Sequence, residues 1–170
     1  MRMLILNIVC LIFCLPSFYG QNSIESRKSV YLELGGNGVL YSLNYDQIVS
    51  PISEKSLWGY RIGIGGTYPL SFRPDDDIII ESKGIPIEAY VLMGKKNHKL
   101  DFGLGLYPNI VVERMNESQL KVDYFLNFGY RYQPSSSGVV IRTGLAVQHF
   151  HLYGINATLP WIRFAIGYAF

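Results

Sequence analysis

The chain has 170 residues, a length typical of one domain, and its formal net charge of +2 at pH 7 gives no support for a nucleic-acid partner. Only 16% of the residues are charged, whereas 49% are hydrophobic, and Tyr and Gly are abundant. This combination argues against an ordinary soluble domain.

The N-terminal segment has the order of a secretory signal peptide. Arg2 gives it a positive start, residues 3–15 are apolar apart from Asn7, and Gly20 precedes a polar stretch. The apolar stretch is too short for a comfortable membrane-spanning helix, so an uncleaved anchor is the weaker alternative. We predict a signal peptide over residues 1–20, cleaved near Gly20, and an exported domain over residues 21–170.

Both cysteines, Cys10 and Cys14, fall inside this predicted signal peptide. The mature chain therefore contains no cysteine, which excludes disulfides, thiolate metal sites and cysteine nucleophiles from it. Anchoring as a lipoprotein through Cys14 is disfavoured because the bulky Phe13 precedes it.

Residues 29–49 form the first region of predicted strand. Their apolar residues fall on even positions before the run 35–38 and on odd positions after it. One long bulged strand is an alternative, and it would require a further strand near residues 78–81. A two-residue hairpin turn at Gly36–Asn37 removes the conflict, and a turn at Asn37–Gly38 preserves the parity and is a stronger hairpin signal. The first turn predicts these facing pairs: Leu34 with Val39, Leu32 with Tyr41, and Val30 with Leu43.

Six further segments alternate with a period of two, which indicates strands. Each has roughly 9–11 residues, the length at which a tilted strand crosses a bilayer. One face is bulky and apolar, and the other carries glycines, small residues and isolated charges. In a membrane barrel, the bulky face turns to lipid and the polar face fills the lumen. The segments are 57–68, 85–93, 99–107, 122–133, 139–149 and 161–170.

With the hairpin, the strand count is eight, and single-chain bacterial barrels have even strand numbers. Polar connections alternate between short and long, as expected of an antiparallel barrel with tight turns at one end. We therefore predict an all-β fold, an antiparallel eight-stranded transmembrane β-barrel. The predicted short turns are 50–55, 94–98 and 134–138, and the predicted long loops are 69–83, 112–120 and 150–159.

The last seven residues alternate aromatic or aliphatic side chains with small ones and end in Phe. This ending resembles the C-terminal signature of outer-membrane barrels. The resemblance implies a barrel-assembly signal that the assembly machinery would bind. Its residues are Phe164, Ile166, Tyr168 and Phe170.

A second resemblance covers most of the mature chain. Residues 32–38 with 41–45, residues 129–134, residues 142–144 and the final Gly167-Tyr168-x-Phe170 resemble small outer-membrane β-barrels of Bacteroidetes-type bacteria. The resemblance implies a barrel in the outer membrane of a Gram-negative cell. It implies no activity, because those relatives are largely uncharacterised.

Seven charged residues fall on the predicted lumen face. Charges inside a narrow barrel are costly unless they are paired, so we predict a structural salt-bridge network that plugs the lumen. A gate, an ion path or a site for an anionic ligand is the alternative. The seven residues are Glu33, Arg61, Glu88, Asp101, Arg131, Arg142 and Arg163.

His149 and His151 share a face at i, i+2, which would suit a metal or a lipid A-modifying enzyme. Such an enzyme needs a serine nucleophile, and none lies beside the pair, so an interface or loop role is favoured. The run Asp75–Asp77 lacks the ligand spacing of a calcium loop. We expect no metal, no cofactor and no catalytic residue.

The favoured function is a monomeric outer-membrane scaffold with a side-chain-filled lumen, whose outer loops contact the environment. Its expected partners are outer-membrane lipid, lipopolysaccharide and the barrel-assembly machinery. A narrow channel or transporter is the first alternative, and a lipid A-modifying enzyme is less favoured. A soluble lipocalin-like binder conflicts with seven inward charges.

Overall fold

The computed structural model describes residues 27–53, 56–67, 70–71, 79–113, 117–152 and 155–170. The predicted signal peptide and the run Asp75–Asp77 lie outside them. In the described part of the chain, no helix is long and apolar enough to cross a membrane. The strands are β1 (Lys28–Leu34), β2 (Tyr41–Ser53), β3 (Ser56–Gly66), β4 (Leu70–Ser71), β5 (Ile79–Gly84), β6 (Ile87–Lys95), β7 (His98–Glu113), β8 (Glu117–Tyr132), β9 (Gly138–Leu152) and β10 (Ile155–Ala169), and η1 (Gly36–Gly38) is a 3₁₀ helix.

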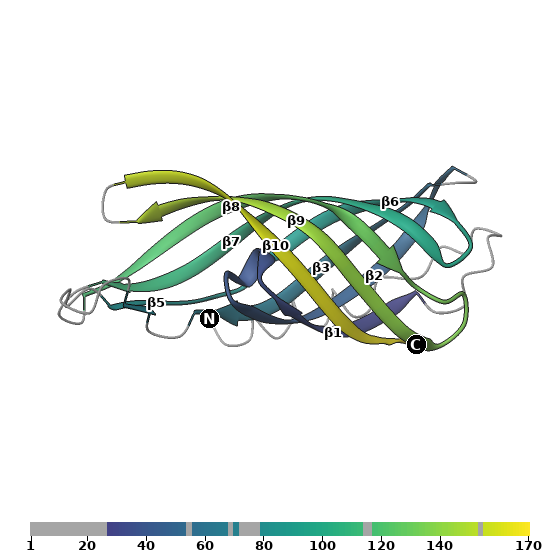
Figure 1. The fold of residues 1–170 in the computed structure, drawn as a ribbon, viewed down its shortest axis with the longest axis horizontal. Coiled ribbons are helices and arrows are strands. Elements are labelled where there is room, and N and C mark those ends of the chain that lie inside the picture. Colours follow the sequence, from purple (N-terminus) through teal and green to yellow (C-terminus); the bar gives the residue numbers. More distant parts are fainter. Residues whose placement is uncertain (1–26, 54–55, 68–69, 72–78, 114–116, 153–154) are drawn as a thin grey trace, which may run out of the picture.

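The strands close into one antiparallel barrel (Figure 1). Neighbouring strands of the ring are antiparallel, and β1 pairs with β10 to close it. β5 and β6 both pair with β3 and β7 in a single register, so together they form one interrupted barrel strand. The interruption contains Pro86, which has no N–H to donate to the ladder. β4 pairs with β5 and adds no position to the ring. The predicted eight-stranded barrel is confirmed.

The end of the barrel where β1 begins and β10 ends is called the inner end here. The first and last strands are joined there by two backbone hydrogen bonds, Lys28 N to Phe170 O at 3.3 Å and Phe170 N to Lys28 O at 2.9 Å. The same end holds the β6–β7 and β8–β9 connections, residues 96–97 and 133–137, which overlap the predicted short turns 94–98 and 134–138. The other end is called the outer end.

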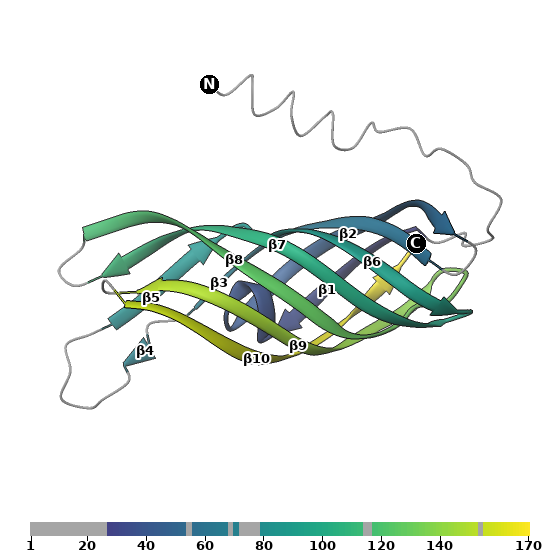
Figure 2. The ribbon, with the colours of Figure 1, turned by 90° about the horizontal axis from the view of Figure 1, so that it is seen from above.

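At the outer end, β5 and β7 to β10 extend far beyond β1 (Figure 2). β7 and β8 have 16 residues each and β9 and β10 have 15 each, whereas β1 has 7. The β7–β8 ladder continues to Glu113 and Glu117, and the β9–β10 ladder to Leu152 and Ile155. The prediction of long loops at 112–120 and 150–159 is therefore wrong for most of their length. These tips lack the strict alternation of a strand with one lipid-facing side, which is the signal that marked the other strands.

The first connection also differs from its prediction. Leu34 pairs with Tyr41, and residues 35–40 fold back into the barrel as η1 and its flanks. A two-residue turn is therefore wrong. The shift of two residues leaves the paired residues of β1 and β2 on their predicted faces, but Val39, predicted to face Leu34 on the outside, is buried in the lumen. Gly35 and Gly36 have φ values of 68° and 74°, which let the chain turn inward, and Gly36, Asn37 and Gly38 are buried.

Candidate functional site

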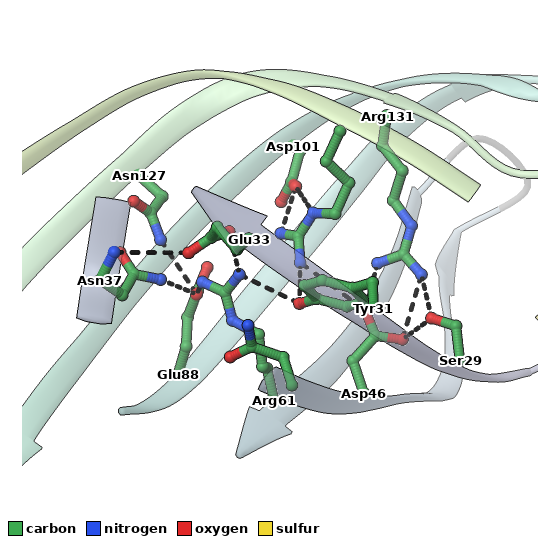
Figure 3. A network of polar contacts seen from close by, with 12 residues as sticks. Ser29, Tyr31, Glu33, Asn37, Asp46, Arg61, Glu88, Asp101, Asn127 and Arg131 are labelled. Atoms are coloured by element: carbon green, nitrogen blue, oxygen red, sulfur yellow. Dashed lines mark hydrogen bonds and ion pairs between the residues drawn. The ribbon is translucent and has the colours of Figure 1, made fainter. Parts of the chain in front are cut away.

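The polarity of the barrel is inverted relative to a soluble protein. Its four largest fully buried side chains are arginines, whereas Leu32 is 60% exposed and Ile64 is 63% exposed. Period-two alternation produces this directly, because successive side chains of a strand point to opposite faces. The candidate site is therefore the lumen, where eight ionisable side chains meet, one from each of β1, β2, β3, β6, β7, β8, β9 and β10 (Figure 3).

The contacts nearest the inner end are between Arg131 and Asp46. Arg131 Nη1 lies 2.5 Å from Asp46 Oδ2, and Nη2 lies 3.1 Å from Asp46 Oδ1. Ser29 Oγ donates to Asp46 Oδ1 at 2.5 Å and accepts from Arg131 Nη2 at 3.2 Å. This two-pronged geometry is the strongest form of a charge-assisted hydrogen bond.

In the middle of the lumen, Asp101 holds two arginines. Arg142 contacts Asp101 Oδ2 through Nε at 2.9 Å and also through Nη2, while Arg163 Nη2 lies 3.1 Å from the same oxygen. The Tyr31 hydroxyl accepts from Arg142 and, at 3.0 Å, from Arg61 Nη1. Both guanidinium groups lie within 6 Å of the centroid of the Tyr31 ring. Tyr31 therefore links the middle of the network to its outer part.

Toward the outer end, Arg61 pairs with Glu88 and, at 3.1 Å, with Glu33. The loop η1 joins here: the Asn37 amide donates to Glu88 Oε2 at 3.1 Å, and its backbone N–H donates to Glu33 Oε1 at 3.3 Å. Asn127 Nδ2 donates to Glu88 Oε2 at 2.9 Å. The inward fold of η1 is thus held by the same carboxylates that hold Arg61.

An apolar cluster borders the charged network at each end. The inner cluster comes from β2, β3 and β6. The outer cluster comes from the residue that follows η1 and from β7 and β8, with Trp161 of β10 packed against it. All the members of both clusters are at most 9% exposed, Trp161 excepted. Side chains thus fill the lumen on both sides of the charges. The inner cluster is Ile48, Leu57, Tyr90 and Leu92, and the outer cluster is Val39, Tyr107 and Phe125.

All seven charged residues singled out in the sequence lie in this network, at 0–1% exposure. Sequence reasoning missed Asp46, which raises the acids to four against four arginines. Its signal was present, because Asp46 follows Ser42 and Asn44 on the inward face of β2. Asn37 could not be found this way, because η1 belongs to no strand.

The four residues of the predicted assembly signal all point outward from β10 or its end. Phe164, Ile166, Tyr168 and Phe170 are each about half exposed. Their strand pairs with β1 and β9, and their side chains lie together on the outer surface.

His149 also lies on the outer surface, on β9. Its ring stacks on Tyr124 at a centroid distance of 4.6 Å, and Nδ1 lies 2.8 Å from Thr158 Oγ1. The His151 side chain lies outside the described part of the chain. Among the described residues, no three His, Cys, Asp or Glu side chains are grouped to hold a metal ion.

No family model and no curated protein matches this chain. Among solved structures, Neisserial surface protein A has 10% identity and a TM-score of 0.48, covering 85% of this chain and 92% of its own. Ail, the attachment invasion locus protein of Yersinia pestis, has 13% identity and a TM-score of 0.47, covering 86% and 99%. Its complex with the heparin analogue sucrose octasulfate scores 0.44 at 13% identity. At these identities and TM-scores, the similarity supports no conclusion about function, and the barrel fold is defined by the strand pairing itself.

Proposed function

We propose that this protein is an outer-membrane β-barrel that serves as a structural or interaction scaffold with a closed lumen. The observation that carries the proposal is the inverted polarity, with leucine and isoleucine outside and paired arginines inside. In water, such an exterior would be a very large exposed apolar surface, whereas a bilayer accommodates it.

Aromatic and histidine side chains support a membrane location. Tyr124 and His149 stack toward the outer end, and His98 contacts Tyr130 and Tyr132 at the inner end. Between these two levels, the outward side chains of β8 are apolar. The tilted strand rises about 20 Å between them, close to the roughly 25 Å apolar band of such barrels. The side chains at the two levels thus resemble interfacial girdles.

The charge balance of the lumen supports a closed scaffold over a channel. Four arginines face four acids, so the network has no excess charge to attract one kind of ion. Apolar clusters on both sides of the network disfavour a continuous water path. Eight strands enclose an interior that side chains just fill.

We also propose that the protein is not an enzyme, is exported with removal of residues 1–20, and is of the Bacteroidetes type. The stacking of His149 on Tyr124 gives that histidine an interfacial use rather than a catalytic one. The expected partners are the membrane lipids and the barrel-assembly machinery.

The test is cell fractionation combined with gel mobility of heated and unheated samples. We expect the protein in the outer-membrane fraction, a shift in mobility on heating, and an N-terminus near Gln21 by mass spectrometry. A soluble protein without a mobility shift would overturn the proposal.

The closed lumen is tested separately in planar bilayers. We expect no stable conductance from the wild type. Arg142→Gln tests the channel alternative: a wild-type conductance that this variant alters would support the channel and overturn the scaffold.

A further inference from the structure

Lys99 is a buried lysine at the inner end of the barrel, outside the charged network. It is 6% exposed, and alternation along β7 places its side chain on the lumen face, as it does that of Asp101. Its ammonium donates to the Lys96 carbonyl oxygen at 2.9 Å. Within the described part of the chain, no carboxylate pairs with it.

Lys99 gives the lumen an unbalanced positive charge. Strand pairing places it directly opposite Arg131, which is in turn directly opposite Arg142, so three basic side chains lie in one inward row. Like charges directly opposite each other destabilise a sheet. Asp46 and Asp101 already hold the two arginines. Because a buried charge is costly without a counter-charge, the position of Lys99 favours an anion from outside the chain.

Further hydrogen-bond donors are available beside Lys99. An ammonium has three N–H donors, of which the Lys96 carbonyl takes one. Arg131 Nε is buried and has no hydrogen-bond partner among the described residues. Lys96 itself has a φ of 51°, which is uncommon for a residue with a side chain, and its carbonyl holds the Lys99 ammonium at the turn. The inner mouth of the lumen thus presents fixed, incompletely used donors.

The electrostatic field of the inner end also attracts anions. Apart from the network, every described charged residue at this end is basic, and such one-signed surfaces raise the local concentration of ions of opposite charge. These residues are Arg27, Lys28, Lys95, Lys96 and Lys99.

We propose that the inner mouth of the lumen binds a phosphate group through Lys99. A lysine ammonium acts as a point charge with rotatable donors, which suits a tetrahedral group with several acceptor oxygens. The planar fork of Arg131, which would suit a carboxylate, is occupied by Asp46. A free phosphate ion and a phospholipid headgroup share this chemistry. The proposal requires the barrel fold and is independent of the scaffold role.

The test uses the full mature chain refolded in non-ionic detergent and titrated with inorganic phosphate by calorimetry at constant ionic strength. We expect Lys99→Met to raise the Kd for phosphate by about tenfold or more, the effect of losing one charge-assisted hydrogen bond. Lys95→Gln removes an exposed lysine beside the same turn and should keep the wild-type Kd. Acetate should bind more weakly than phosphate.

Gln133→Glu tests the charge argument with Lys99 still present. Gln133 is buried, follows Arg131 by two residues on the chain, and donates its backbone N–H to the Asn97 carbonyl in the β6–β7 turn at 2.9 Å. The variant adds a carboxylate diagonal to Lys99 at nearly constant size. We expect it to abolish phosphate binding and to raise the urea midpoint of unfolding. Gel mobility of heated and unheated samples verifies that each variant folds.

Phosphate binding that Lys99→Met leaves intact overturns the site, and acetate binding as tight as phosphate binding overturns the choice of ligand. If the wild type binds no free phosphate, retention of phosphatidylglycerol from vesicles is counted by native mass spectrometry. Retention that depends on Lys99 assigns the headgroup as the source, and retention that does not overturns the proposal. Cell fractionation and conductance are unaffected by these outcomes, so the scaffold proposal succeeds or fails separately.

Discussion

The β1–β2 and β9–β10 hairpins finish in opposite ways at the outer end of the barrel. The β1–β2 connection folds into the lumen, where Asn37 bonds to Glu33 and Glu88. The β9–β10 hairpin runs straight outward as a paired ladder to Leu152 and Ile155. In the first hairpin, the Asn37 backbone N–H donates a hydrogen bond to the Glu33 carboxylate. In the second, the backbone groups bond to the neighbouring strand. The charged network, and not the strands alone, therefore determines the shape of the first loop.

The largest effect should follow from breaking the network itself. Asp46→Asn removes the acid that binds Arg131 in two-pronged fashion and leaves that guanidinium buried without its counter-charge. We expect a loss of about 3–5 kcal/mol in the free energy of unfolding, measured by urea titration in vesicles. Glu81→Gln breaks the exposed ion pair with Lys83 and should leave the free energy of unfolding nearly unchanged, because solvent screens that pair.

The double variant Asp46→Leu with Arg131→Met sharpens this prediction. Replacing a buried pair by apolar residues is often neutral, so most of the lost stability should return. A double variant no more stable than Asp46→Asn would contradict the view that the unpaired charge causes the loss.

An intermediate effect should follow from removing the inward loop. Joining Leu34 to Tyr41 through Asn-Gly deletes η1 and leaves Glu33 and Glu88 with fewer donors. We expect a loss of about 1–3 kcal/mol in unfolding free energy. Removal of Val39 should also uncover Trp161, seen as a red-shifted fluorescence in a Trp58→Phe background. An unchanged free energy of unfolding would show that the network holds the loop in place but that the loop does not stabilise the barrel.

The smallest effect should come from shortening the opposite hairpin. Replacing residues 151–156 by an Asn-Gly turn removes the tip of the β9–β10 ladder, which touches no part of the charged network. The unfolding free energy should change by about 0.5 kcal/mol or less. A loss as large as that from deleting η1 would erase the contrast between the two hairpins.

Alternation made the barrel predictable, because it assigns every strand residue to one of two faces. The inward positions of Arg61, Arg142 and Asp101 follow from it directly. The fate of the first loop does not, because no periodic signal marks residues 35–40. Their inward fold depends on carboxylates that other strands supply, and such tertiary contacts leave no trace in local sequence. The outer ends of β7 to β10 were predicted as loops for a related reason, because these ends lack a continuous apolar face.

The closure of the ring by β1 and β10 has a consequence for how the chain reaches its final form. Arg131 bonds to Ser29 and Arg142 to Tyr31, over separations of 102 and 111 residues, and Ser29 pairs with Ala169. Contacts this distant in sequence carry a high contact order and form slowly. No charge in the lumen can be fully shielded before the final strand is in place. The chain must therefore assemble almost at once, with arginines and carboxylates meeting as the ring shuts.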